Sequence, residues 1–231
     1  MAENSFEWRP LGISFYRRPV LEVARALIGH YLVRVLKGKR LMGRIVETEA
    51  YGGLVDPASH SFRGPTERCM SMFGPVGRAY VYFTYGNHYC FNVIAGQRRL
   101  AGAVLIRGLE TVAGTSTVRR LRAAAINPGR TRDRLLRGEA DRQLANGPGK
   151  LSAALSIDRA WDGHDLTRGH ALWVARGQNV RRVLWTPRVG LGKNPAASWF
   201  WRCIDPASWG LTRLAKSWPT AKQPRPTLRE L

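Results

Sequence analysis

Acidic residues are scarce in this 231-residue chain. Lys and Arg number 37 against 16 Asp and Glu, so the formal net charge is +21 with neutral histidines. A polyanion neutralises such an excess most naturally, because each phosphate that meets a Lys or Arg side chain releases a condensed counterion. We therefore favour nucleic acid as the partner over an anionic membrane or a basic surface that serves solubility alone.

Long apolar runs and paired cysteines are also lacking. No uninterrupted apolar run approaches the roughly 20 residues of a membrane-spanning helix, and the start MAENSFEWRP lacks the basic-then-apolar order of a secretory signal. Cys69, Cys90 and Cys203 are odd in number and far apart, which is typical of a reducing compartment. We therefore expect a cytoplasmic protein without membrane contact, associated with the nucleoid if the organism is prokaryotic.

Metal-binding and phosphate-loop motifs are absent. No C-x-x-C or H-E-x-x-H spacing accompanies His60 and His88, so neither a metal nor a cofactor is expected. The segment NGPGK lacks the four-residue spacer and the following Ser or Thr of a P-loop. Lys150 in that segment is interpreted as a phosphate contact or a surface lysine rather than as a nucleophile.

The residues that are present predict a mixture of helices and strands. A helix is expected over 19–28, strands over 30–36, 41–51 and 103–110, and a hairpin over 79–96 that turns at 85–87. Because no regular βαβ alternation occurs, we predict a single α+β domain with a curved antiparallel sheet, surrounding helices and a protruding β-hairpin. Residues 1–16 are expected to form an N-terminal tail, 17–218 the domain and 219–231 a Pro-rich C-terminal tail.

The second half of the chain predicts shorter elements. A basic helical segment over 118–144 is broken at 127–129, and 151–157 has the pattern of a short buried helix. Three later runs are strand-like, over 172–177, 181–190 and 198–204. The loop over 52–78 is long for a compact domain, and such loops are more often functional than idle.

The segment ETEAY carries the strongest candidate chemistry. Strand periodicity places Glu47, Glu49 and Tyr51 on one face. A carboxylate beside a stackable ring is suited to activating water next to a bound base, and His60 could complete such a pocket. Two simpler interpretations stay open: a surface counter-charge, and a structural Glu47 that is hydrogen-bonded to the backbone.

The hairpin is rich in aromatic residues. Strand periodicity places Tyr80 and Tyr82 on one face. Phe83, Tyr89 and Phe91 are interpreted as sheet core. Tyr85 falls in the turn, and an exposed wedge there suits insertion between base pairs.

Five segments occur together in one order: RIVETEAYGG, DPASHSFRGPT, MFGPVGRAYVYFTYGNHYCFNV, AVLIRGLE and NGPGKL. This set resembles the alkyladenine (3-methyladenine, methylpurine) DNA glycosylase family, from about residue 17 to the strand near 190. The resemblance implies a monomeric, monofunctional hydrolase of base excision repair that acts on double-stranded DNA. It implies removal of 3-methyladenine, 7-methylguanine, hypoxanthine or ethenoadenine, with an abasic site as product and no lyase activity.

The resemblance also implies roles for single residues. Glu49 matches the general base and Arg107 the arginine that helps hold the attacking water. Cleavage of an N-glycosidic bond builds positive charge on the sugar, which a nearby carboxylate stabilises while it accepts a proton from water.

The remaining implied roles concern binding of the damaged base. Tyr51 on one side, with His60 and Tyr82 on the other, matches the rings that enclose the flipped base. Asn92 matches the pocket asparagine that disfavours an exocyclic amine at the purine 2-position. Tyr85 matches the wedge that fills the gap in the duplex.

Two positions depart from the family pattern. Cys69 ends a T-E-R-C segment where relatives commonly carry T-P-R-N, and Asn87 stands where a methionine often follows the wedge turn. Both are expected to affect DNA binding or lesion search rather than catalysis.

A non-catalytic protein that binds damaged DNA or RNA remains the alternative. A hydrolase of free nucleosides is disfavoured, because such a substrate does not need a protein with a net charge of +21.

Overall fold

A computed structural model describes residues 8–84 and 86–212. The wedge candidate Tyr85 and the expected C-terminal tail therefore lie outside the described residues. The strands are β1 (Tyr31–Leu36), β2 (Lys39–Tyr51), β3 (Ala79–Thr84), β4 (His88–Ile94), β5 (Ala103–Ala113), β6 (Leu172–Ala175), β7 (Leu184–Thr186) and β8 (Arg202–Ile204). The α-helices are α1 (Ile13–Tyr16), α2 (Val20–Leu27), α3 (Thr115–Ala124), α4 (Arg130–Leu136) and α5 (Pro148–Ala154).

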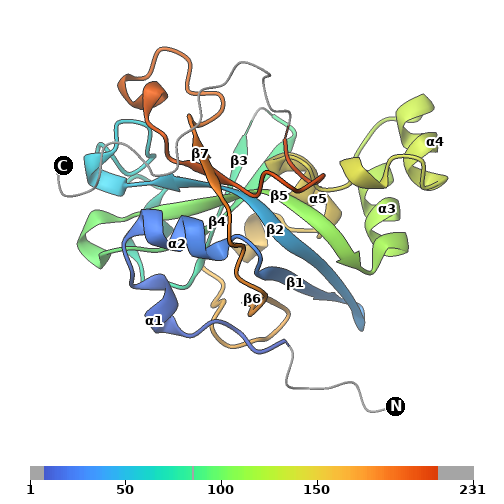
Figure 1. Ribbon diagram of the computed structural model, residues 1–231, viewed down its shortest axis with the longest axis horizontal. Coiled ribbons are helices and arrows are strands. Elements are labelled where there is room, and N and C mark those ends of the chain that lie inside the picture. Colours follow the sequence, from blue (N-terminus) through green and yellow to red (C-terminus); the bar gives the residue numbers. More distant parts are fainter. Residues whose placement is uncertain (1–7, 85, 213–231) are drawn as a thin grey trace.

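The eight strands form one antiparallel sheet. Its order is β3-β4-β5-β2-β1-β6, and β8 pairs with β2 and with β7. Figure 1 shows α1 and α2 together beside the sheet and α3 and α4 projecting at the opposite end of the molecule. The α+β prediction with an antiparallel sheet is confirmed.

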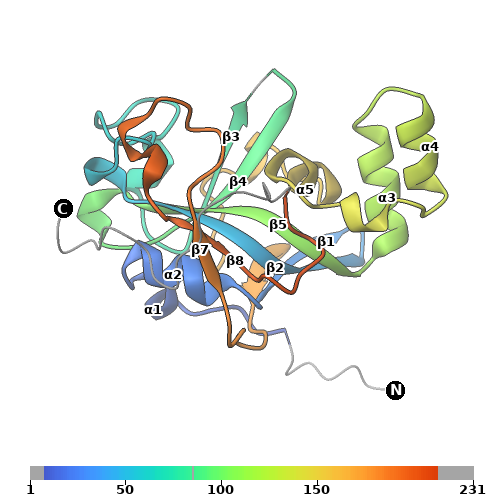
Figure 2. The same ribbon diagram turned by 45° about the horizontal axis from the view of Figure 1, so that its top comes forward.

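The hairpin β3–β4 rises from the body of the protein, as Figure 2 shows. Because β5 pairs with β4 only over Asn92–Ile94, no third strand of the described residues lies beside the outer part of the hairpin. Phe83, expected in the sheet core, lies in this outer part and is 48% exposed, so that prediction is wrong. Phe91, nearer the sheet, is fully buried as expected.

The strand β2 is central and changes partners along its length. β5 pairs with Met42–Tyr51, whereas on the other edge β1 pairs with Lys39–Arg44 and β8 with Glu47–Glu49. Both edges of the second half of β2 are therefore paired, and its residues from Ile45 to Ala50 are all buried, including Glu47, Thr48 and Glu49. The segment before Arg17 also packs on the domain, since Leu11 and Tyr16 belong to the core.

Candidate active site

A pocket of about 210 Å³ opens where the hairpin, β2 and the loop over 52–78 meet. We call it the central pocket. Its volume is below the 300–1,000 Å³ typical of sites for drug-sized ligands, and it suits one flat ring system. It is lined by five of the predicted site residues: Tyr51, His60, Tyr82, Asn92 and Arg107. The long loop contributes Ala58, Ser59, His60, Arg68 and Met72 to the lining.

Aromatic rings form much of one wall. The His60 ring meets Tyr82 edge to face, with 4.6 Å between centroids, and its Nδ1 lies 2.7 Å from the Tyr80 hydroxyl. Desolvation of the imidazole and the charge of Arg68 lower the pKa of His60 to about 4. His60 is therefore neutral near pH 7 and presents no charge that would repel a cationic base.

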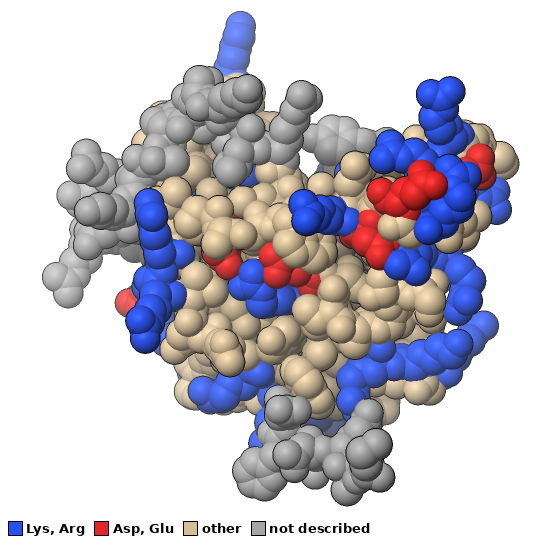
Figure 3. Space-filling model, turned by 45° about the vertical axis from the view of Figure 1, so that its right-hand side comes forward, with Lys and Arg blue, Asp and Glu red and all other residues tan. Residues whose placement is uncertain are grey.

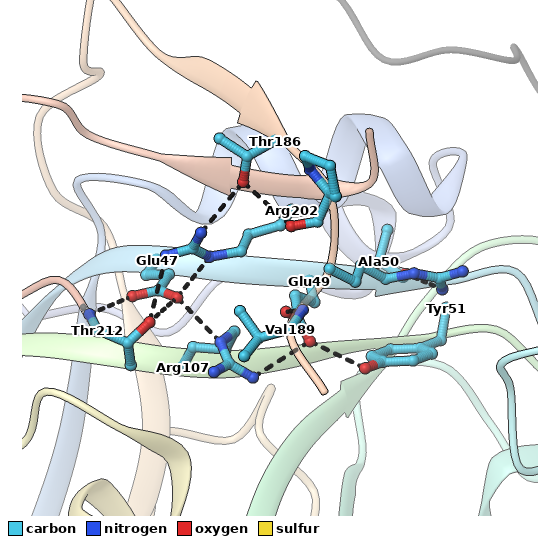
Figure 4. Close-up of polar contacts among 11 residues, drawn as sticks. Glu47, Glu49, Ala50, Tyr51, Arg107, Thr186, Val189, Arg202 and Thr212 are labelled. Carbon is cyan, nitrogen blue, oxygen red and sulfur yellow. Dashed lines mark hydrogen bonds and ion pairs between the residues drawn. The ribbon is translucent and has the colours of Figure 1, made fainter. Parts of the chain in front are cut away.

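Two buried glutamates lie beside the pocket, both on β2 (Figure 4). Arg107 connects them, since its Nε donates to Glu47 Oε1 at 2.9 Å and its Nη1 to Glu49 Oε2 at 3.3 Å. The local register explains this position: Glu47 pairs with Gly108 and Thr48 with Ile106, so Arg107 falls at a β-bulge between β2 and β5. Bulges of this kind re-aim a side chain next to functional sites.

Glu49 has a compact set of donors. Its Oε2 accepts hydrogen bonds from the Tyr51 hydroxyl at 2.9 Å and from Arg107, and its Oε1 accepts one from the Val189 backbone N–H at 2.7 Å. All three donor residues line the central pocket, although Glu49 itself is fully buried. The carboxylate therefore lies in the layer directly behind the pocket wall.

Glu47 is instead enclosed by structural contacts. Its carboxylate accepts from Arg107, from Arg202 Nε at 2.6 Å and from both the backbone N–H and the hydroxyl of Thr212. Burial alone would raise the pKa of Glu47, but the charges of Arg202 and Arg107 hold it below its ordinary value. The interpretation of Glu47 as a structural residue bonded to the backbone is confirmed, because Thr212 N donates to its Oε2.

Comparison with known proteins decides the family. The family model for methylpurine-DNA glycosylase (MPG) matches residues 14–208. A protein of Carboxydothermus hydrogenoformans named as a candidate 3-methyladenine DNA glycosylase is 47% identical over 179 residues, which are 77% of this chain and 86% of that protein. A protein of Frankia casuarinae with the same name is 45% identical over 205 residues, 84% of this chain and 87% of its own.

The chain belongs to the methylpurine-DNA glycosylase family. This glycosylase is thus a hydrolase of N-glycosyl bonds in DNA and belongs among the DNA-repair enzymes. In the part of the glycosylase that the structure describes, no helix has the length and apolarity that crossing a membrane requires. Across residues 8–84 and 86–212, no three His, Cys, Asp or Glu side chains gather as they would around a metal ion.

Sequence reasoning missed the residues that close the glycosylase site from the C-terminal side. Arg188 and Asp56 form a fully buried ion pair, with Nη2 of Arg188 2.9 Å from Oδ1 of Asp56. Arg188 also donates to the Ala50 carbonyl at 2.8 Å and lies 4.7 Å from the Tyr51 ring centre. This anchorage fixes the backbone of Val189 against Glu49.

No spacing signal could have revealed the Arg188–Asp56 pair, because the partners are 132 residues apart. The same holds for Arg202, 155 residues from Glu47. Only an unusual context offered a hint, since Arg202 stands inside the otherwise apolar run SWFWRCI.

Proposed function

We propose that this glycosylase extrudes alkylated or deaminated purines from duplex DNA and hydrolyses their N-glycosidic bond with a water activated by Glu49. One observation carries the proposal: a buried carboxylate whose donors Tyr51, Arg107 and Val189 all line an aromatic pocket. Extrusion costs a few kcal/mol and is least costly for a damaged or mispaired base.

The geometry of the central pocket supports roles for four of its lining residues. The rings of Tyr51, His60 and Tyr82 provide stacking surfaces, and electron-rich faces attract a base that carries positive charge. Asn92 lies on β4 with its amide nitrogen donating to the Tyr80 carbonyl at 3.0 Å. That bond holds the Asn92 side chain at the pocket wall, where it would disfavour an exocyclic amine on the purine.

The chemical step uses two groups. Glu49 accepts a proton from water and stabilises the positive charge that develops on the sugar as the bond to the base breaks. Arg107, which is 7% exposed, lines the pocket while bonded to Glu49 and would position the water. Water is the nucleophile in this scheme, so the product is an abasic site and no strand-cleaving lyase step follows. We further propose that the enzyme acts as a monomer in the cytoplasm.

The proposal is tested with labelled duplexes that carry one hypoxanthine, and in parallel with alkylated DNA. After incubation, alkali cleavage reveals abasic sites, and Glu49→Gln serves as the control. Release by the wild type that is lost in the variant supports the reaction and the general base. Tight binding to the lesion duplex without release would instead indicate a damage-recognition protein.

The wedge role is tested separately with Tyr85→Ala. This variant is expected to bind and extrude the lesion more weakly while Glu49 chemistry on a base that is already unpaired is retained. Equal loss on paired and unpaired lesions would contradict the role of Tyr85 in extrusion.

A further inference from the structure

A second cavity, of about 360 Å³, lies on the other side of the first turn of α5. We call it the lateral cavity. The start of β4, the C-terminal half of α3 and the helix α5 enclose it; His88, Tyr89, Arg122, Ser152 and Asp158 are among its lining residues. Figure 2 shows the raised hairpin on one side of α5 and the α3–α4 projection on the other.

Two buried polar groups in this cavity lack partners. Arg122 is 7% exposed and Ser152 1%, and both border the lateral cavity. Within the part of the chain that the structure describes, neither Arg122 Nε nor Ser152 Oγ has a hydrogen-bond partner, and Arg122 forms no ion pair there. A buried cation without a counter-charge is costly, as is a buried hydroxyl without a hydrogen bond. Both costs fall if an anion occupies the cavity.

Charges of both signs lie near the cavity: Lys150 adds a positive charge near Arg122, and Asp158 a negative one in the lining. Lys150 lies on α5, and burial together with the charge of Arg122 lowers its pKa. Burial likewise lowers the pKa of Arg122. The carboxylate that lines the cavity is Asp158, whose Oδ1 accepts a hydrogen bond from Ala160 N at 3.0 Å.

The position of the cavity relates it to the duplex. His88 begins β4 directly after the hairpin turn, and it packs so closely on α5 that a Cβ on Gly149 would lie 2.7 Å from its Cγ. Pro148 lines the central pocket and Gly149 the lateral cavity, so the two cavities flank the start of α5. If the hairpin contacts the duplex as proposed, the lateral cavity lies next to the bound DNA, because His88 and Tyr89 of the hairpin line it.

We propose that the lateral cavity binds one backbone phosphate of the duplex, with the Arg122 guanidinium and the Ser152 hydroxyl as donors. A phosphodiester supplies both the negative charge and the acceptor oxygens that these two groups lack. The inference rests on the proposed function only in taking duplex DNA as the ligand. It adds a phosphate-binding site that is separate from the pocket for the base.

The first test measures affinity for an undamaged duplex over a range of salt concentrations by fluorescence anisotropy. Arg122→Gln is expected to bind about tenfold more weakly, and the slope of log K against log salt is expected to be shallower by about 0.9. Arg120→Gln is the matched control, because Arg120 lies two residues away on α3 and is exposed. Equal slopes for Arg122→Gln and wild type would overturn the proposal.

The second test locates the phosphate. Single neutral methylphosphonates are placed along both strands of a hypoxanthine duplex, with Glu49→Gln as the background so that the base is not released. A methylphosphonate at one particular linkage is expected to lower affinity about tenfold in this background. The same substitution is expected to have no effect when Arg122→Gln is added. If every methylphosphonate that lowers affinity in the Glu49→Gln background lowers it equally in the double variant, the proposal is wrong.

Further arms separate the outcomes. Ser152→Ala keeps the charge and is expected to weaken binding several-fold at the same linkage, which tests the site even if Arg122→Gln fails to fold. Inorganic phosphate could stabilise wild type, but not Arg122→Gln, against heat. If at the same time no methylphosphonate effect depends on Arg122, the cavity is a site for a free anion and the proposal is wrong. If the protein does not bind the hypoxanthine duplex more tightly than undamaged DNA, the proposed function fails. The salt-dependence test uses undamaged DNA, so it still tests phosphate binding in the lateral cavity.

Figure 3 shows the charge pattern of the surface over the α3–α4 projection. Lys and Arg side chains gather over the α3–α4 projection, but acidic side chains lie among them. Arg119 is paired there with Asp141, and Arg137 with Glu139 at 2.5 Å. Arg122, on the inner side of the same projection, has no such partner among the described residues, and unlike Arg120 it is buried.

Discussion

Arg107 Nη1 lies 3.3 Å from Oε2 of Glu49, and both groups are almost completely buried. Burial opposes the charge of the guanidinium, but Glu49 and Glu47 raise the pKa of Arg107 above its ordinary value. The arginine is therefore permanently charged and ties Glu49, the proposed general base, to the structural Glu47. This link separates the consequences of changing the two glutamates.

Changing Glu49 is expected to remove chemistry rather than DNA binding. Glu49→Gln keeps the size of the side chain, so the stacking surfaces and phosphate contacts remain, while base release falls to background. Because all neighbours of the carboxylate donate, the new amide nitrogen must face a donor, at a cost of about 1–3 kcal/mol in the free energy of unfolding. Excision and equilibrium-binding assays check the two parts, and near-normal excision would contradict the role of Glu49.

Changing Glu47 is expected to remove stability. Glu47→Gln leaves Arg107 and Arg202 buried without their shared counter-charge, and the free energy of unfolding should fall on the order of 3 kcal/mol. Urea denaturation measures this loss. A variant as stable as wild type would show that Glu47 is not the structural centre of this network.

The Tyr51 hydroxyl is expected to orient Glu49. Tyr51→Phe retains the stacking ring but loses the 2.9 Å hydrogen bond to Glu49. The single-turnover rate of excision should fall about tenfold, while affinity for the lesion duplex stays within twofold. Parallel losses in rate and affinity would mean that the hydroxyl contributes to base binding instead.

Acid is expected to destabilise the fold through His30. This residue is 5% exposed, and its Nδ1 accepts a hydrogen bond from the Gly177 N–H at 3.1 Å, so the ring is neutral. Burial, followed by the charges of Arg176 and Arg18, lowers the pKa of His30 to about 4 from 6.5. The unfolded chain therefore binds a proton between pH 6.5 and 4 that the folded chain does not, and the stabilisation present above pH 6.5 is lost as pH falls.

The size of the His30 effect follows from the shift. Between pH 6.5 and 4, wild type should lose on the order of 3 kcal/mol more unfolding free energy than His30→Gln. Urea titrations at half-unit pH steps provide the comparison. Identical pH slopes for the two proteins would show that another group is responsible.

Local patterns were sufficient for much of the architecture. The helix over 19–28, the strands around ETEAY and AVLIRGLE and the hairpin turn are all where periodicity and turn residues predict them. The helix break at 127–129 is also confirmed, since α3 ends at Ala124 and α4 begins at Arg130. These features depend on neighbours within a few residues, which is why a single sequence specifies them.

The shared face of Glu47, Glu49 and Tyr51 could also be predicted from the sequence, because alternation along a strand is a local property. The folded chain was needed to show which glutamate is structural, since that depends on Arg202 and Thr212, more than 150 residues away. It likewise left Phe83 exposed by ending the β4–β5 pairing at Asn92. Burial and long-range pairing are set by the packing of distant segments, and no local pattern encodes them.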